Sequence, residues 1–190
     1  MPIPDGFKDH YANLLAEAAS ASKEAPLSIE LITGWNRELL EPFYPDLAGK
    51  FRSERRTLEF PHRPNGRGEW AEVVTEATPV REMHGHLMKA FEQFEQVRSS
   101  NFASAEEAAG PVAWPAALTM RCQPFEYGST LIAFAVLIAA GQRAGWEVNR
   151  MDWDDKVVRA RLYWAVRSNR PATIKPFAEH LAEYMTKAGS

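Results

Sequence analysis

A short polar turn, Gly128-Ser129-Thr130, stands directly before the longest apolar run of the sequence, Leu131 to Ala140. The N-terminus of a helix carries unpaired amide groups and a partial positive charge, so this turn can hold a phosphate or a carboxylate. Serine is also among the preferred residues for capping a helix, so Ser129 can simply cap the helix that follows. The sequence therefore predicts a weak anion site at Gly128, Ser129 and Thr130, beside a purely structural role for Ser129.

The other polar clusters offer poorer chemistry. His84 and His86 are two residues apart on a predicted helix and so face different ways, and the remaining histidines have no partner at metal-ligand spacing. The aspartates between positions 152 and 155 suit the start of a helix, where the helix dipole favours negative charge. The single cysteine, Cys122, allows neither an internal disulfide nor a cysteine-based zinc site. We therefore expect no metal centre.

The composition indicates one domain and limits its partners. Of the 190 residues, 45% are hydrophobic, which is enough for one substantial core. The 22 basic and 25 acidic side chains are mixed along the chain, so we expect neither nucleic acid nor a membrane as a partner. The longest apolar run is about half the length of a membrane-spanning helix. The start of the sequence, residues 1–5, has neither a basic stretch nor an apolar stretch of signal-peptide length, so we do not expect export through a cleaved signal. We expect a cytoplasmic location, and secretion as an effector without a cleaved signal remains open.

Hydrophobic spacing predicts the elements that position the turn. Helices are expected at roughly 9–19, 28–41, 78–97, 114–122, 129–145, 152–169 and 173–187, with a short additional segment that Ser104 opens and Gly110-Pro111 stops. Alternation at 56–60 and the β-prone stretch at 70–74 flank an Asn-Gly turn and predict a hairpin. The fold class is therefore all-α, with about seven or eight helices and a small β-hairpin flap.

Two segments of the sequence share a pattern with a known family. Residues 122–131 read Cys-Gln-Pro-Phe-Glu-Tyr-Gly-Ser-Thr-Leu, and residues 44–52 read Tyr-Pro-Asp-Leu-Ala-Gly-Lys-Phe-Arg. The first resembles the Fic motif, which is His-Pro-Phe, any residue, an acid, then Gly-Asn-Gly-Arg. The second is similar to the segment that leads into the Fic flap hairpin. The resemblance covers roughly Ser28 to Asn149 and implies one Fic-like domain over residues 1–190, with its core at about 28–149 and C-terminal helices at about 152–187.

The resemblance implies the architecture of a transferase in which the side chains that carry out the transfer are replaced. Fic proteins transfer AMP or a related group to a hydroxyl, which needs a base, a magnesium-binding acid and a cation for the phosphates. In this sequence the base histidine corresponds to Gln123, the acid to Tyr127, the asparagine to Ser129 and the arginine to Leu131. Glu126 occupies the variable position, where a solvated surface side chain is expected. We therefore expect no catalytic residue in this motif.

Two functional hypotheses remain open. The first is a catalytically degenerate Fic-like protein that binds another protein as a regulator, adaptor or assembly partner, through the flap residues Leu58, Phe60, Trp70 and Val73. Candidate partners are an active enzyme, a toxin and a secretion component. The alternative is a transferase that does not use AMP but holds a nucleotide or a nucleotide-linked substrate in the altered pocket. Under the first hypothesis no cofactor is expected, with weak nucleotide binding left open.

Overall fold

The computed structural model describes residues 3–21, 25–62, 69, 71–98, 102–149, 156–167 and 171–189. The helices are α1 (Phe7–Ala21), α2 (Ile29–Leu40), α3 (Val80–Arg98), α4 (Ala105–Cys122), α5 (Ser129–Arg143), α6 (Lys156–Val166) and α7 (Lys175–Ala182), with a 3₁₀ turn at Pro171–Ile174. The strands are β1 (Thr57–His62), β2 (Ala71–Glu76), β3 (Trp146–Val148) and β4 (Met185–Lys187). This architecture confirms the predicted class, a mostly helical fold with a small hairpin. None of the helices in the described residues is long and apolar enough to cross a bilayer.

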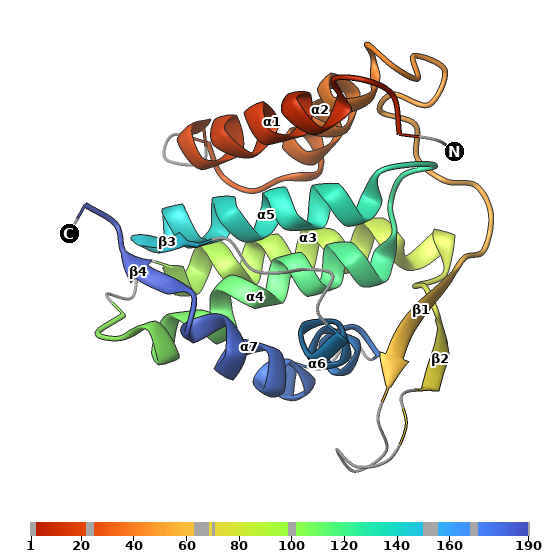
Figure 1. Cartoon of the computed structure of the whole chain (residues 1–190). Coiled ribbons are helices and arrows are strands. Elements are labelled where there is room, and N and C mark those ends of the chain that lie inside the picture. The colour runs from red at the N-terminus through yellow and green to blue at the C-terminus, as the bar shows by residue number, and fades with distance from the viewer. Residues whose placement is uncertain are drawn as a thin grey trace.

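The apolar helix α5 lies at the centre of the fold. In Figure 1, α1 and α2 cover one side of it, and α3 and α4 lie on the other, followed by α6 and α7. Because α5 is apolar around nearly its whole circumference, it must be enclosed by other elements. Its last turn also packs tightly, since a Cβ atom at Gly141 would stand 2.7 Å from Val148 Cγ2 and 2.9 Å from the Trp146 carbonyl oxygen. Only glycine allows β3 to approach α5 this closely.

Helix α4 is longer than its sequence predicts. Ser104 caps it, accepting a hydrogen bond from the Glu107 amide at 3.4 Å, as expected. However, the predicted stop at Gly110-Pro111 and the predicted start at Trp114-Pro115 are wrong, because Pro111 and Pro115 both lie inside one continuous helix. A proline in a helix interior costs about 3 kcal/mol. Burial offsets this cost, since every residue from 112 to 120 is buried.

The predicted hairpin is present and its two faces differ. Strands β1 and β2 are antiparallel, with Phe60 opposite Val73 and Glu59 opposite Val74. One face packs on the helical body beside α6, and Phe60 on this face is only 6% exposed. The opposite face is turned outward, and Val74 there is 60% exposed. The predicted Asn-Gly turn lies outside the described residues.

The C-terminal region differs from its predicted helical pattern. The last helix ends at Ala182 rather than at about residue 187, because the chain turns and forms β4. Strand β4 pairs with β3, with Trp146 opposite Lys187 and Val148 opposite Met185. Trp146 and Met185 are both buried, so this small sheet covers the end of α5.

Candidate functional site

The loop between α4 and α5 begins at a residue with an unusual backbone. Gln123 has φ 44° and is the one residue other than glycine with positive φ in the described part of the chain. Its side chain is buried, and Nε2 donates hydrogen bonds to the Met120 carbonyl at 2.9 Å and to Thr130 Oγ1 at 3.3 Å. A left-handed conformation costs roughly 1–2 kcal/mol in a residue with a Cβ atom. The loop therefore keeps Gln123 in an unfavourable backbone conformation, and the side-chain NH₂ group of Gln123 is already used in two hydrogen bonds within the protein.

The predicted capping role of Ser129 is wrong. Gly128, with φ 81°, is the N-cap of α5 and supplies no side-chain hydrogen bond. Ser129 is instead the first helical residue, and its hydroxyl accepts from the Phe125 amide at 2.9 Å and donates to the Phe125 carbonyl at 3.2 Å. The side chain is 2% exposed. The hydroxyl therefore bonds within the loop, and of the three residues of the predicted anion site only Thr130 is exposed.

Asn36 on α2 holds the loop in place, and the sequence analysis missed it. It is fully buried, and its Nδ2 donates to the Tyr127 carbonyl at 2.9 Å while its Oδ1 accepts from the Gly49 amide at 2.9 Å. The same Nδ2 would lie 3.1 Å from a Cβ atom at Gly128, which with the positive φ explains the glycine there. The available signal was a polar residue on the apolar face of α2, directly after Trp35.

Two further positions of the motif serve packing. The ring of Tyr127 lies edge-on against Tyr44, with 5.6 Å between ring centroids. Leu131 is half-buried, and its carbonyl oxygen accepts a hydrogen bond from the Tyr11 hydroxyl at 3.0 Å. Burial raises the pKa of Tyr11, so this hydroxyl remains a donor throughout the physiological range.

Glu126 is not the solvated surface residue that the sequence predicts. One carboxylate oxygen accepts from the Ser53 amide at 3.0 Å, and the other lies 3.2 Å from Arg56 Nη2. The Glu126 side chain is 30% exposed. Glu126 therefore links the loop between α4 and α5 to the segment that leads into β1.

Arg52 forms the strongest link between the loop and the hairpin, and it too was missed. Its side chain is 2% exposed, and Nε donates to the Gln123 carbonyl at 2.7 Å while Nη2 donates to the Cys122 carbonyl at 2.9 Å and to the Thr78 carbonyl. Nη1 donates to the Glu54 carbonyl at 2.6 Å. Burial lowers the pKa of Arg52, although an arginine stays charged at neutral pH. The Arg52 guanidinium therefore links the end of α4 to the segment before β1 and the segment after β2, in each case through backbone carbonyl groups.

Cys122 lies behind this cluster with a fully buried thiol. Burial raises the pKa of the thiol to about 11, and the nearby Thr78 hydroxyl, Arg121 and Arg52 oppose this rise only in part. A thiol that is kept protonated and buried is a poor nucleophile. We therefore assign Cys122 to the core.

The raised pKa of Cys122 predicts a loss of stability at alkaline pH. In the unfolded chain the thiol loses its proton near pH 8.5, whereas in the folded chain it keeps the proton up to about pH 11. Stability that is present below about pH 8.5 is therefore lost as the pH rises toward the folded pKa. The expected loss is about 2 kcal/mol between about pH 8 and about pH 10. Urea unfolding of the wild type and Cys122→Ala across this range measures it, and equal slopes in the two proteins would rule out this contribution.

The predicted flap contacts mostly face the helical body. Phe60 is buried, and Leu58 and Val73 are partly buried against the core. Trp70 lies outside the described residues. Because side chains on a strand alternate between faces, the outward face instead carries Val74 with Glu59, Glu72 and Glu76. A partner that contacts the hairpin meets this outward face or the edge of β2.

The histidines on α3 do not assemble a metal site. His84 lies against the ring of Phe51, with 4.7 Å between centroids, and His86 lies 3.9 Å from Glu82. Within the described residues no group of three or more histidine, cysteine, aspartate or glutamate side chains is placed to hold a metal ion. The aspartates between 152 and 155 lie outside the described part of the chain.

The comparisons with known proteins identify the fold. The sequence matches no protein-family model and no curated protein. Solved structures match over nearly the whole chain: a Fic-domain signaling protein from Bacteroides thetaiotaomicron is 17% identical, with a TM-score of 0.69 over 94% of this chain and 67% of that one. The effector BepC from Bartonella tribocorum, with bound AMPPNP, is 14% identical, with a TM-score of 0.65 over 97% of this chain and 88% of that one. The N-terminal Fic domain of an effector from Bartonella quintana, with bound ADP, is 16% identical, with a TM-score of 0.65 over 98% of this chain and 87% of that one. This chain therefore has the Fic fold.

Proposed function

We propose that this Fic-fold chain is a catalytically degenerate protein that binds another protein as a regulator, adaptor or assembly partner. The observation that carries the proposal is the state of Gln123, at the position that corresponds to the Fic base. Its buried amide group donates to the Met120 carbonyl and to Thr130 Oγ1. An amide cannot take up a proton near neutral pH, so this side chain cannot activate a target hydroxyl.

The other motif positions support the same conclusion. Magnesium in Fic enzymes needs a carboxylate, but the corresponding Tyr127 offers a phenol that packs on Tyr44. The phosphate-binding arginine corresponds to Leu131, which has no charge and is half-buried against the core. The residues of this loop therefore do not fit a magnesium-bound triphosphate. What the loop retains is its packing and the hydrogen bonds that join it to α2 and the hairpin.

The hairpin is the element best suited to bind a partner. In the described residues β2 pairs with β1 alone, so the other edge of β2 keeps free backbone donors and acceptors. Such an edge can pair with an extended segment of another chain. The outward face beside it is acidic, with Glu59, Glu72 and Glu76 around the exposed Val74. A partner segment that pairs here is expected to carry basic side chains on the same face.

A charge reversal on the hairpin tests the proposal. We expect Glu72→Lys with Val74→Lys to reduce partner capture about tenfold or more, because the change removes an apolar contact and repels basic side chains. The matched control is Glu92→Lys with Met88→Lys on the exposed face of α3, which makes the same chemical changes away from the hairpin. The measurement is the amount of each protein from the native cell that is retained on the three immobilised chains.

Two results would contradict the proposal. Equal retention by the hairpin variant and the wild type would exclude the hairpin as the binding surface. Transfer of AMP from labelled ATP to any captured protein, lost in Gln123→Ala, would show that the motif loop is catalytic.

A further inference from the structure

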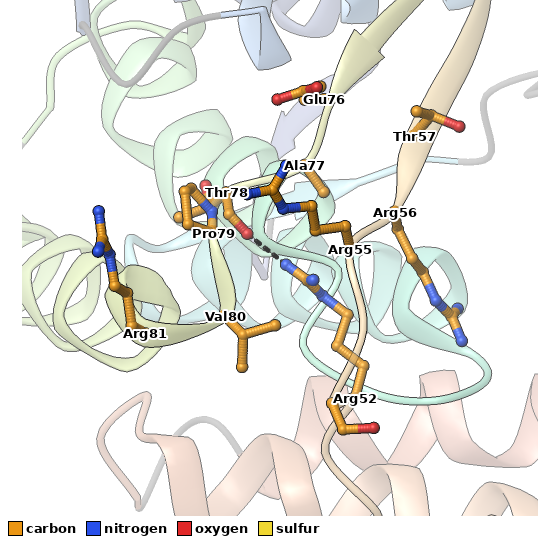
Figure 2. Close-up of a pocket in the computed structure, with 11 residues that line it drawn as sticks. Arg52, Arg55, Arg56, Thr57, Glu76, Ala77, Thr78, Pro79, Val80 and Arg81 are labelled. Carbon is orange, nitrogen blue, oxygen red and sulfur yellow. Dashed lines mark hydrogen bonds between the residues drawn. The ribbon is translucent and has the colours of Figure 1, made fainter.

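A basic pocket lies at the root of the hairpin, apart from the motif loop. It has a volume of about 570 Å³ and is lined by two segments, one from Arg52 to Thr57 and the other from Glu76 to Arg81. Four of the lining residues are arginines and one is an acid, Glu76. Figure 2 shows Arg52 and Arg55 reaching toward Thr78 and Pro79. No residue of the loop between α4 and α5 lines this root pocket.

The positive charge of the root pocket is only partly compensated. Arg52 is buried, yet its hydrogen-bond partners are backbone carbonyl groups rather than carboxylates. Arg56 is paired with Glu126. Arg55 is exposed and forms no ion pair with any described residue, and Arg81 is 86% exposed, with only Nε 3.3 Å from a Glu82 oxygen. Two guanidinium groups at the pocket are therefore available to a ligand.

We propose that the root pocket binds a phosphomonoester group. Arginine presents a planar fork of donors that matches phosphate oxygens. The start of α3 adds the amide groups of Val80 and Arg81 and the positive end of the helix dipole, while the Glu82 amide donates to the Pro79 carbonyl at 2.9 Å.

The size of the root pocket indicates an ester rather than a bare ion. Pockets of roughly 300–1,000 Å³ accommodate organic ligands, and the volume here lies within that range. The organic part belongs either to a free small molecule or to a phosphorylated side chain of a protein. Both sources present the same dianion to the arginines.

Calorimetric titration of the 190-residue chain tests the proposal with two probes, phenyl phosphate and an extended peptide that contains one phosphoserine. The same peptide without its phosphate is the control ligand. We expect saturable binding of at least one probe, and at least about a tenfold weakening in the double variant Arg55→Ser, Arg81→Ser. Both side chains are exposed, so this variant should fold normally. The control is Lys8→Ser with Lys89→Ser, which removes two positive charges from exposed positions elsewhere and should change the affinity less than about twofold.

The outcomes are distinct. Tighter binding of the phosphopeptide than of phenyl phosphate assigns the ligand to a protein, and equal binding assigns it to a small molecule. The proposal fails if neither probe binds, if the unphosphorylated peptide binds as well as the phosphopeptide, or if both double variants lose affinity equally. None of these readouts depends on partner capture by the hairpin edge, so this proposal and the proposed function fail separately.

Discussion

Replacing Arg52 by methionine should lower the free energy of unfolding by about 3–5 kcal/mol, because several buried carbonyl groups would lose their donors together. These carbonyls belong to Cys122, Gln123 and Thr78, on segments far apart in the sequence. Methionine fills much of the same space but donates no hydrogen bond. Urea unfolding at neutral pH, with the wild type measured in parallel, gives the difference.

The control for this change is Arg55→Met, three residues along the chain. Arg55 is exposed, so its replacement should change stability by less than about 0.5 kcal/mol. If Arg52→Met fails to fold, Arg52→Lys keeps the charge but not the fork, and it should retain only part of the stability. A loss for Arg52→Met no larger than that for Arg55→Met would show that the carbonyl groups find other donors, and that Arg52 does not hold the loop.

Local patterns in the sequence predict those structural features that depend on interactions between residues close together in the chain. Ser28 caps α2, accepting from the Leu31 amide at 3.1 Å, and this cap is visible in the sequence because it depends on neighbours three residues apart. The apolar stripe of α3 is confirmed at Met83 and Phe94, both buried, whereas Val97 in the last turn is 40% exposed. The spacing of apolar residues along a helix does not show at which residue the buried part of the helix ends.

The missed elements depend on tertiary contacts. Pro111 and Pro115 are local signals for a helix end, but packing of α4 against α5, α3 and α7 overrides them. Strand β4 forms because β3 is available to pair with it. The sequence of a three-residue strand does not indicate that such a partner strand is present.

The candidate site shows the same limit. Its residue types can be read from the sequence, so the proposed correspondence of Gln123 to the Fic base needs no coordinates. The roles of Asn36 and Arg52 are not, because both side chains bond to backbone groups that any sequence would present. Ser129 is the intermediate case, since a serine beside a helix start has two local uses and only the structure distinguishes them.

Phe125→Ala should also destabilise the chain by about 3–5 kcal/mol, the usual cost of removing a fully buried phenylalanine. The Phe125 ring is 0% exposed and stacks on Phe51, with 5.2 Å between centroids, and the backbones of the two residues form an isolated β-bridge. The melting temperature should fall by on the order of 10 °C. The control is Phe43→Ala, a half-buried ring in the turn after α2 that packs edge-on against Phe7 of α1, and this change should cost markedly less.

This prediction also tests whether the loop between α4 and α5 serves packing, as the proposed function requires. If the loop now serves packing, Phe125→Ala should lower stability while leaving partner capture intact at temperatures where the variant is folded, because the outward hairpin face does not include Phe125. Phe125→Leu, which keeps most of the buried volume, should recover much of the stability. Loss of capture in the folded Phe125→Ala variant would instead place the partner on the loop itself, and the hairpin would then be the support rather than the binding surface.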